Sequence, residues 1–147
     1  MTVSILIPAL DEAACIEATL ARALRQTRPV EVLVVDGGSA DGTVALASRH
    51  VRVLEAPRGR ASQMNAGARA ASGEILLFLH ADTRLPDGAL DDVRAAVADP
   101  AVLGGCFRTT FDADGFWLRV WSHPVWMRWH RLAFGDRAPF VRREVFE

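Results

Sequence analysis

The sequence contains no lysine and no tyrosine, and all 17 of its basic residues are arginine. Without lysine, the chain cannot build a Walker-type phosphate loop, a Schiff base with a carbonyl substrate or the lysine contact of a protein kinase. The 18 acidic residues leave a net charge of −1, so no excess of positive charge favours nucleic acid or an acidic membrane surface. We therefore expect no nucleic-acid partner.

Cysteines and long apolar runs are also scarce. The two cysteines, Cys15 and Cys106, lack the spacing of metal ligands, and we expect both to be buried structural thiols in a reducing compartment. No apolar run reaches the roughly 18 residues that a membrane-spanning helix needs. The N-terminus begins in a strand pattern without a basic leader, so we expect a cytoplasmic protein without a signal peptide.

Half of the 147 residues are hydrophobic, which is enough for the core of a single domain spanning 1–147. The pattern predicts strands at 2–10, 30–35, 51–55, 74–79 and 102–111, and helices at 11–26, 41–50, 61–71 and 87–98. Strands that alternate with helices predict an α/β fold with a doubly wound, mostly parallel sheet. The run at 74–79 is apolar at every position after Glu74, so we expect that strand to be buried on both faces.

Two of the apolar runs end in an acidic residue followed by turn-forming residues. Asp36 comes directly after the run at 30–35, and Asp82 follows the run at 74–79. In open α/β sheets, ligands bind outside the carboxyl ends of the strands. The two carboxylates therefore predict a site at this edge of the sheet for a nucleotide, a metal ion or both.

Four segments carry a family resemblance by their order and spacing. They read ILIPALDE at 5–12, VVDGGSADGT at 34–43, RASQMNAG at 60–67 and ASGEILLFLHAD at 71–82. With these motifs the sequence resembles the family 2 glycosyltransferases from its first strand to Asp82. The resemblance implies a GT-A fold, the fold of nucleotide-diphospho-sugar transferases. It also implies transfer of a sugar, with inversion, from a nucleotide-sugar donor such as a UDP-sugar.

The residues of these motifs suit the parts of a nucleotide-sugar. Asp36 can accept a hydrogen bond from a pyrimidine N–H or a ribose hydroxyl, and the resemblance implies the contact to uracil. Glu12 and the backbone at Pro8 and Ala9 are expected to flank the same nucleoside. Arg60 can offer a bidentate fork to base or phosphate oxygens. The alternatives are that Asp36 forms only a turn with the glycines after it, and that Arg60 is a solvated loop residue.

The resemblance also implies a divalent cation, Mg²⁺ or Mn²⁺, that neutralises the departing diphosphate. Asp82 is the expected metal ligand. His80 stands two positions earlier, where most relatives have another aspartate, and the motif here reads His80-Ala81-Asp82. An imidazole suits Mn²⁺ less well than a carboxylate, but it can ligate the metal or contact a phosphate. We expect His80 and Ala81 to lie against the donor, and a histidine that touches no metal is the alternative.

Other polar residues of the motifs have structural interpretations. Asp41 and Thr43 are expected to form a turn and a helix cap rather than to contact a ligand. Asp11 is expected at the N-terminus of the helix at 11–26, where acidic residues are favourable. Asn65 and Gly67 are expected to serve helix packing and close approach of the backbone.

All four tryptophans lie in one short segment, at Trp117, Trp121, Trp126 and Trp129, with arginines between them. One interpretation is a helical cover over the acceptor side of the sheet. The other is peripheral contact with a membrane at the inner face of the plasma membrane, since aromatic and basic residues suit the headgroup layer. Such contact would suit a lipid-linked or carotenoid acceptor. Segments 134–137 and 140–146 resemble a bacterial subgroup of small transferases that includes carotenoid-acid glycosyltransferases.

Inverting transfer needs a general base to take the proton of the acceptor hydroxyl. Relatives continue beyond the arginine-rich strand and carry a Glu-Asp pair whose aspartate is this base, and the present sequence has no such pair. Asp136 is the nearest candidate. We expect a donor half at 1–100 and the start of an acceptor half at 101–147, shortened at its C-terminus. The alternative to a transferase is a non-catalytic module that binds a nucleotide-sugar.

Overall fold

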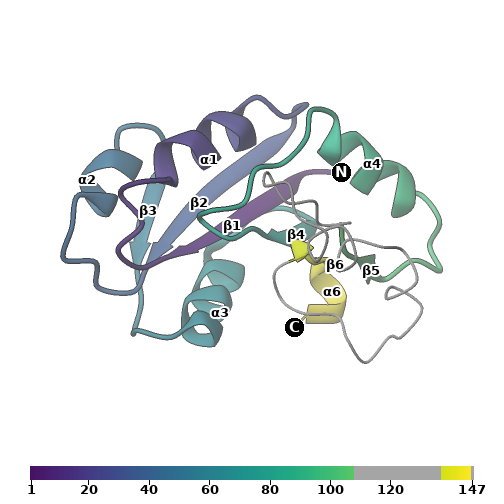
Figure 1. Ribbon diagram of the computed structural model, residues 1–147. Coiled ribbons are helices and arrows are strands. Elements are labelled where there is room, and N and C mark those ends of the chain that lie inside the picture. Colours follow the sequence, from purple (N-terminus) through teal and green to yellow (C-terminus); the bar gives the residue numbers. More distant parts are fainter. Residues whose placement is uncertain (108–136, 147) are drawn as a thin grey trace, which may run out of the picture.

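The computed structural model describes residues 1–107 and 137–146. Its elements are β1 (Val3–Ala9), α1 (Ile16–Leu24), β2 (Val30–Asp36), α2 (Thr43–Ala47), β3 (Arg52–Glu55), α3 (Arg60–Ala70), β4 (Ile75–Phe78), α4 (Ala89–Ala96), β5 (Gly104–Gly105), β6 (Phe140–Arg142) and α6 (Arg143–Phe146). The strands form one six-stranded sheet in the order β3-β2-β1-β4-β6-β5. Figure 1 shows this sheet with helices on both faces.

The winding of the sheet reverses beside β1. β1 pairs in parallel with β2 on one side and with β4 on the other, while β3 continues the parallel pairing from β2. After β3, α3 returns the chain across the sheet to β4. β6 runs antiparallel to both β4 and β5. The expected α/β, doubly wound and mostly parallel sheet is therefore confirmed, and its switch point lies where the carboxyl ends of β1 and β4 meet.

Alternating side chains of the strands divide the core into two clusters. On one face, Ile5 and Ile7 of β1 pack together with side chains of α1 and α4, including Leu20 and Leu90. On the other face, Leu6 belongs to a cluster that includes Leu33, Leu76, Phe78 and Ala68 of α3. In Figure 1, α1 and α4 lie above the sheet and α3 lies below it. Every residue of β4 is buried, as its uniformly apolar run predicts.

Several elements are shorter than the sequence pattern predicts. The helix expected at 11–26 begins only at Ile16, because the residues before it bond to the neighbouring loop at 37–43. Asp11 is therefore not a helix N-terminal residue, and its φ of 55° lies in the left-handed region. Of the strand expected at 102–111, Gly104–Gly105 is the part that pairs among the described residues. Both cysteines are half-buried rather than fully buried.

Two adjacent arginines at the junction of β6 and α6 reach helices on opposite faces of the sheet. Arg142 donates through Nη2 to the carbonyl of Val97 (2.6 Å), directly after α4. Arg143 donates to the carbonyls of Ala68 (3.1 Å) and Ala71 (2.7 Å) at the end of α3. The last carbonyls of a helix have no partner inside the helix, and an arginine fork satisfies them. Arg143, the first residue of α6, therefore anchors the C-terminal end of α3, the end opposite to Arg60.

The described residues contain no helix that is long and apolar enough to cross a membrane. The four tryptophans and Asp136 lie outside the described residues. The expectations about membrane contact and about the general base therefore remain predictions.

The turn between α3 and β4 has no room for a side chain at Gly73. A Cβ atom there would lie 2.5 Å from Ser4 Oγ, 2.7 Å from the backbone nitrogen of Ser4 and 2.9 Å from the carbonyl oxygen of Thr2. Two of these three atoms belong to the backbone and cannot move aside cheaply. We expect Gly73→Ala to lower the free energy of unfolding by about 2 kcal/mol or more, measured by urea denaturation.

Gly42→Ala is the matched control. A Cβ atom at Gly42 would meet its nearest neighbours, Ala13 and Leu46, at 3.9 Å, which is ordinary van der Waals contact. The φ angle at this position is −79°, which any residue can adopt. Equal unfolding midpoints for the two variants would contradict the close approach at Gly73.

Candidate functional site

The predicted site residues gather at the carboxyl edge of the sheet. Pro8 and Ala9 end β1, Asp36 ends β2, Arg60 begins α3, Glu12 lies in the loop after β1, and His80, Ala81 and Asp82 follow β4. The register places Ala9 directly beside Asp36. Gly59, with a φ of 134°, allows the sharp entry into α3 that puts Arg60 at this edge. Asp136, the candidate base, lies outside the described residues.

The Asp36 carboxylate is buried, with 3% of the residue exposed. Its Oδ2 atom accepts hydrogen bonds from the backbone N–H groups of Gly38 (2.9 Å) and Ser39 (3.0 Å). Its Oδ1 atom accepts one from the hydroxyl of Ser39. An ionised carboxylate has about four acceptor positions, so these bonds leave one of them on Oδ1. Asp36 therefore shapes its own turn and keeps a single acceptor for a ligand.

The loops after β1 and β2 are joined by hydrogen bonds from backbone to side chain. Asp11 N–H donates to Ser39 Oγ (2.9 Å), and Ala40 N–H donates back to Asp11 Oδ1 (2.8 Å). Closer to the helices, Ala13 N–H donates to Asp41 Oδ2 (3.0 Å). These N–H groups lie outside the sheet ladder, and side chains of the neighbouring loop are their hydrogen-bond partners. The loops therefore hold each other in position.

Asp41 behaves as the expected turn residue. Its Oδ1 atom accepts hydrogen bonds from both the hydroxyl and the N–H of Thr43, and the Thr43 hydroxyl accepts one from Glu12 N–H (2.8 Å). The two hydrogen bonds from Thr43 lower the pKa of the Asp41 carboxyl below its usual range. The turn expected at Asp41 and Thr43 is therefore present, whereas the N-cap of α2 is Gly42, without a hydrogen bond from a capping side chain.

Arg60 and His80 come together from different elements. Nη2 of Arg60 lies 3.1 Å from Nδ1 of His80. A guanidinium donates hydrogen bonds and does not accept them, so Nδ1 of His80 is the acceptor in this pair. The pair joins the first residue of α3 to the end of β4, across the switch point of the sheet.

Asp82, two residues after His80, presents an exposed carboxylate. Its Oδ1 atom accepts a hydrogen bond from the hydroxyl of Thr83 (3.3 Å). The turn that carries Asp82 is anchored to α1, because Thr19 of that helix donates its hydroxyl to the carbonyl of Ala81 (2.6 Å). Within residues 1–107 and 137–146, no group of three or more histidine, cysteine or acidic side chains could hold a metal ion. One open carboxylate fits a cation that a nucleotide brings with it, since phosphate oxygens and water then complete its shell.

Cys15 lies in the segment between β1 and α1, close to several acidic residues. Its thiol donates a hydrogen bond to Glu12 Oε2 (3.1 Å). Burial raises the pKa of Cys15 to about 11, and the hydrogen bond and negative charge of Glu12 act in the same direction. The charges of Asp82 and Asp41 add smaller effects of the same sign. The thiol therefore stays protonated near neutral pH, and its raised pKa reflects the acidic residues close to it.

Gln63 is a residue of this region whose role sequence reasoning missed. The residue is 4% exposed, and its Nε2 atom donates to the carbonyls of Ala9 and Val35, both at 2.8 Å. It thus bridges the ends of β1 and β2 from α3. Its spacing from Gly67 offered a signal, because residues four apart share a helix face. The packing role expected for Gly67 holds, since a Cβ atom there would lie 3.0 Å from Val35.

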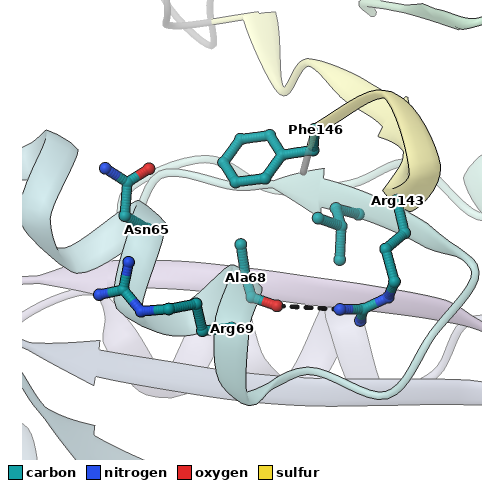
Figure 2. A pocket seen from close by; sticks show the side chains of 6 residues that line it. Asn65, Ala68, Arg69, Arg143 and Phe146 are labelled. Carbon is teal, nitrogen blue, oxygen red and sulfur yellow. Dashed lines mark hydrogen bonds between the residues drawn. The ribbon is translucent and has the colours of Figure 1, made fainter.

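A separate pocket lies between α3 and α6. Its volume is about 330 Å³, and it is lined by Asn65, Ala68, Arg69, Leu76, Arg143 and Phe146. Figure 2 shows Arg143 reaching from α6 to the carbonyl of Ala68 at the edge of this pocket. Asn65 is exposed here, so the helix-packing role expected for it is wrong. None of the predicted donor-binding residues lines this pocket.

Comparison with known proteins identifies the class. The fold is that of the GT-A glycosyltransferases, which share this doubly wound sheet. A family model, that of glycosyl transferase family 2, matches residues 4–145. The chain therefore belongs to glycosyl transferase family 2.

Relatives in sequence are named as glycosyltransferases. Glycosyltransferase AglE of Haloferax volcanii is 36% identical over 91 residues, which cover 54% of this chain and 30% of that protein. A Mycobacterium bovis protein named as an uncharacterized glycosyltransferase is 33% identical over 154 residues, covering 97% of this chain and 68% of that protein. The chain thus spans under a third of the first relative and about two thirds of the second.

Solved structures share the fold. A mannosyltransferase from Pyrobaculum calidifontis, in complex with GDP-Man and Mn²⁺, superposes with a TM-score of 0.74 at 25% identity. The match covers 98% of this chain and 45% of that one. S. aureus TarS 1–349, in complex with UDP-GlcNAc, superposes with a TM-score of 0.70 at 22% identity, covering 78% of this chain and 36% of that one.

The bridge made by Gln63 can be tested by substitution. Gln63→Leu keeps a similar volume but removes both hydrogen bonds to the strand ends. We expect the free energy of unfolding to fall by about 1–3 kcal/mol, because buried carbonyls lose a donor. Urea denaturation measures the change. Asn65→Ala, at an exposed position of the same helix, is the control and should change stability by no more than about 0.5 kcal/mol. A Gln63→Leu variant as stable as the parent chain would show that the bridge is dispensable.

The environment of Cys15 predicts slow alkylation. With a pKa of about 11, roughly one Cys15 thiol in a thousand is ionised at pH 8, and the thiolate is the reactive form. We expect iodoacetamide to modify Cys15 far more slowly in the folded chain than in urea. Glu12→Gln should accelerate the reaction by lowering the thiol pKa, whereas Glu17→Gln, on the exposed side of α1, should not. Equal effects of both substitutions, followed by peptide mass spectrometry, would contradict the contact between Cys15 and Glu12.

Proposed function

We propose that the chain binds a nucleotide-diphospho-sugar, specifically a UDP-sugar, and transfers its sugar with inversion to an acceptor. The observation that carries the proposal is the placement of Asp36, Arg60, His80 and Asp82 along the carboxyl edge of the sheet, with Arg60 and His80 in contact. Membership of glycosyl transferase family 2 supports it. So does the mannosyltransferase neighbour, whose structure contains GDP-Man and Mn²⁺.

The nucleoside occupies the edge between β1 and β2 in this proposal. The free acceptor position of Asp36 takes the ring N–H of uracil, a group that cytosine lacks. Pro8 and Ala9 offer backbone, and Glu12 lies at the start of the adjoining loop. Because Asp36 is almost fully buried, a base without a matching donor would leave the remaining acceptor position on Oδ1 empty, which is unfavourable.

The diphosphate lies toward α3 and the end of β4. Arg60 offers guanidinium N–H groups to phosphate oxygens, and the His80 contact fixes the direction of its side chain. Asp82 holds Mg²⁺ or Mn²⁺ together with the phosphates, and Ala81 anchors that turn to α1. When bound, the cation supplies Lewis-acid neutralisation of the negative charge that develops on the leaving diphosphate.

The acceptor side completes the proposal. Inverting transfer needs a base on the face of the sugar opposite to the diphosphate, and Asp136 is the candidate. The tryptophan-rich segment at Trp117, Trp121, Trp126 and Trp129 would hold an apolar acceptor, lipid-linked or carotenoid, or touch a membrane surface. The protein would then act in the cytoplasm, at the inner face of the membrane.

Metal-dependent donor binding tests the site. We expect UDP to bind the parent chain more tightly with Mn²⁺ or Mg²⁺ than with a chelator, measured by calorimetry. Asp82→Asn should reduce the metal-dependent affinity about tenfold or more, because the carboxylate ligand is lost. Asp92→Asn, on the exposed surface of α4, makes the same change of charge and should bind as the parent chain does.

Two outcomes would count against the proposal. Metal-dependent UDP affinity that survives Asp82→Asn removes this residue from the site. Failure of the parent chain to bind any nucleotide diphosphate removes the proposed function itself. Release of UDP from UDP-sugars, assayed with and without acceptor extract, separates a transferase from a module that only binds the donor.

A further inference from the structure

We propose that Ser39 is a specificity-determining positioning residue, which orients the Asp36 carboxylate so that it accepts one N–H from the nucleobase. This inference rests on the proposed function, because it concerns how the same site distinguishes uracil from cytosine. Ser39 itself is not required to touch the donor. It acts through Asp36, and its own hydroxyl is directed by the loop after β1.

The hydrogen bonds around Asp36 leave little freedom. Gly38 and Ser39 N–H groups both reach Oδ2, at 2.9 and 3.0 Å, so this oxygen has no acceptor position left. The Ser39 hydroxyl occupies one of the two positions on Oδ1. Without that hydroxyl, both acceptor positions on Oδ1 would be open, while the N–H groups of Gly38 and Ser39 would still hold Oδ2. With it, a single acceptor remains in a fixed direction.

The direction of the Ser39 proton is itself determined. A hydroxyl has one proton to donate, and its lone pairs accept. Asp11 N–H donates to Ser39 Oγ at 2.9 Å, which occupies a lone pair and leaves the proton for Asp36. The unusual φ of 55° at Asp11 aims this N–H, and Ala40 N–H holds the Asp11 carboxylate at 2.8 Å. The two loops thus build a relay from Asp11 through Ser39 to Asp36.

The relay predicts a particular kind of selectivity. Uracil carries a ring N–H where cytosine carries an unprotonated ring nitrogen, so uracil satisfies a single acceptor that faces this ring position. The amino group of cytosine donates from a neighbouring position, which an acceptor fixed in that direction does not meet. When Ser39 is altered, the second open position on Oδ1 can take a water molecule or accept the amino group of cytosine, so the site should bind both bases more equally. Affinity for UDP should fall while affinity for CDP changes little. A purely structural role would instead weaken both nucleotides in parallel.

The test compares the affinities of UDP and CDP, with Mn²⁺ present, by calorimetry on the 147-residue chain. We expect Ser39→Ala to lower the UDP to CDP affinity ratio about fivefold to tenfold, the value of one hydrogen bond. Ser39→Thr retains the hydroxyl and should restore the ratio. Thr43→Val is the matched control, since Thr43 contributes a hydroxyl to the same pair of loops but does not contact Asp36. It should lower stability and leave the ratio unchanged.

The outcomes distinguish failure of the proposed role of Ser39 from failure of the proposed nucleotide-sugar binding. A folded Ser39→Ala variant with the parent's UDP to CDP ratio overturns the relay. If Ser39→Ala does not fold, Ser39→Cys keeps a similar volume with a weaker donor, and a parental ratio in that variant overturns the relay as well. A ratio that falls equally in Thr43→Val assigns the effect to loop structure and also overturns it. Lack of UDP binding in the parent chain contradicts the proposed function itself.

Discussion

The Gln63 amide, wedged between the ends of β1 and β2, is the contact on which the site depends. Beyond Ala9 and Asp36 the two strands separate into loops, and the carbonyls of Ala9 and Val35 lie at the point of separation, where the Ala9 carbonyl also accepts the N–H of Gly37 (2.9 Å). Gln63 satisfies them from α3, the helix whose first residue is Arg60. One buried amide therefore joins the nucleoside edge of the site to the helix that carries its arginine.

Around Gln63, the buried strands and the arginine contacts make the structure rigid, whereas the residues at the carboxyl edge of the sheet are more exposed. β1 and β4 are almost entirely buried, and arginines of β6 and α6 hold the far ends of α3 and α4. At the rim, Asp82 and Arg60 remain exposed, so they can meet a charged ligand without a large desolvation cost. Asp36 is the exception. Its buried carboxylate is held by three hydrogen bonds from its own turn, which suits recognition of a neutral base more than of a phosphate.

Sequence reasoning succeeded where a residue's position follows from its place in a strand. The run at 74–79 predicted a fully buried strand, and the acidic residues after the runs predicted an edge at which Asp36 and Asp82 would both arrive. It failed at Asp11, because acidic residues before a helix look alike whether they begin it or bond to another loop. The Ser39 hydroxyl that fixes the Asp11 N–H lies 28 residues away, and nothing local indicates it.

By itself, the sequence determined the fold class, the family and the edge of the sheet at which the site forms. The spacing of apolar residues, the order of the motifs and the ends of the strands can all be read along the chain without knowing which residues are in contact. Only the tertiary structure decided which polar groups meet. The contacts of Arg60 with His80, Gln63 with Ala9, and Asp11 with Ser39 each join segments at least 20 residues apart. Such pairings depend on how α3 crosses the sheet and how two loops fold against each other, and both are set by packing of the whole domain.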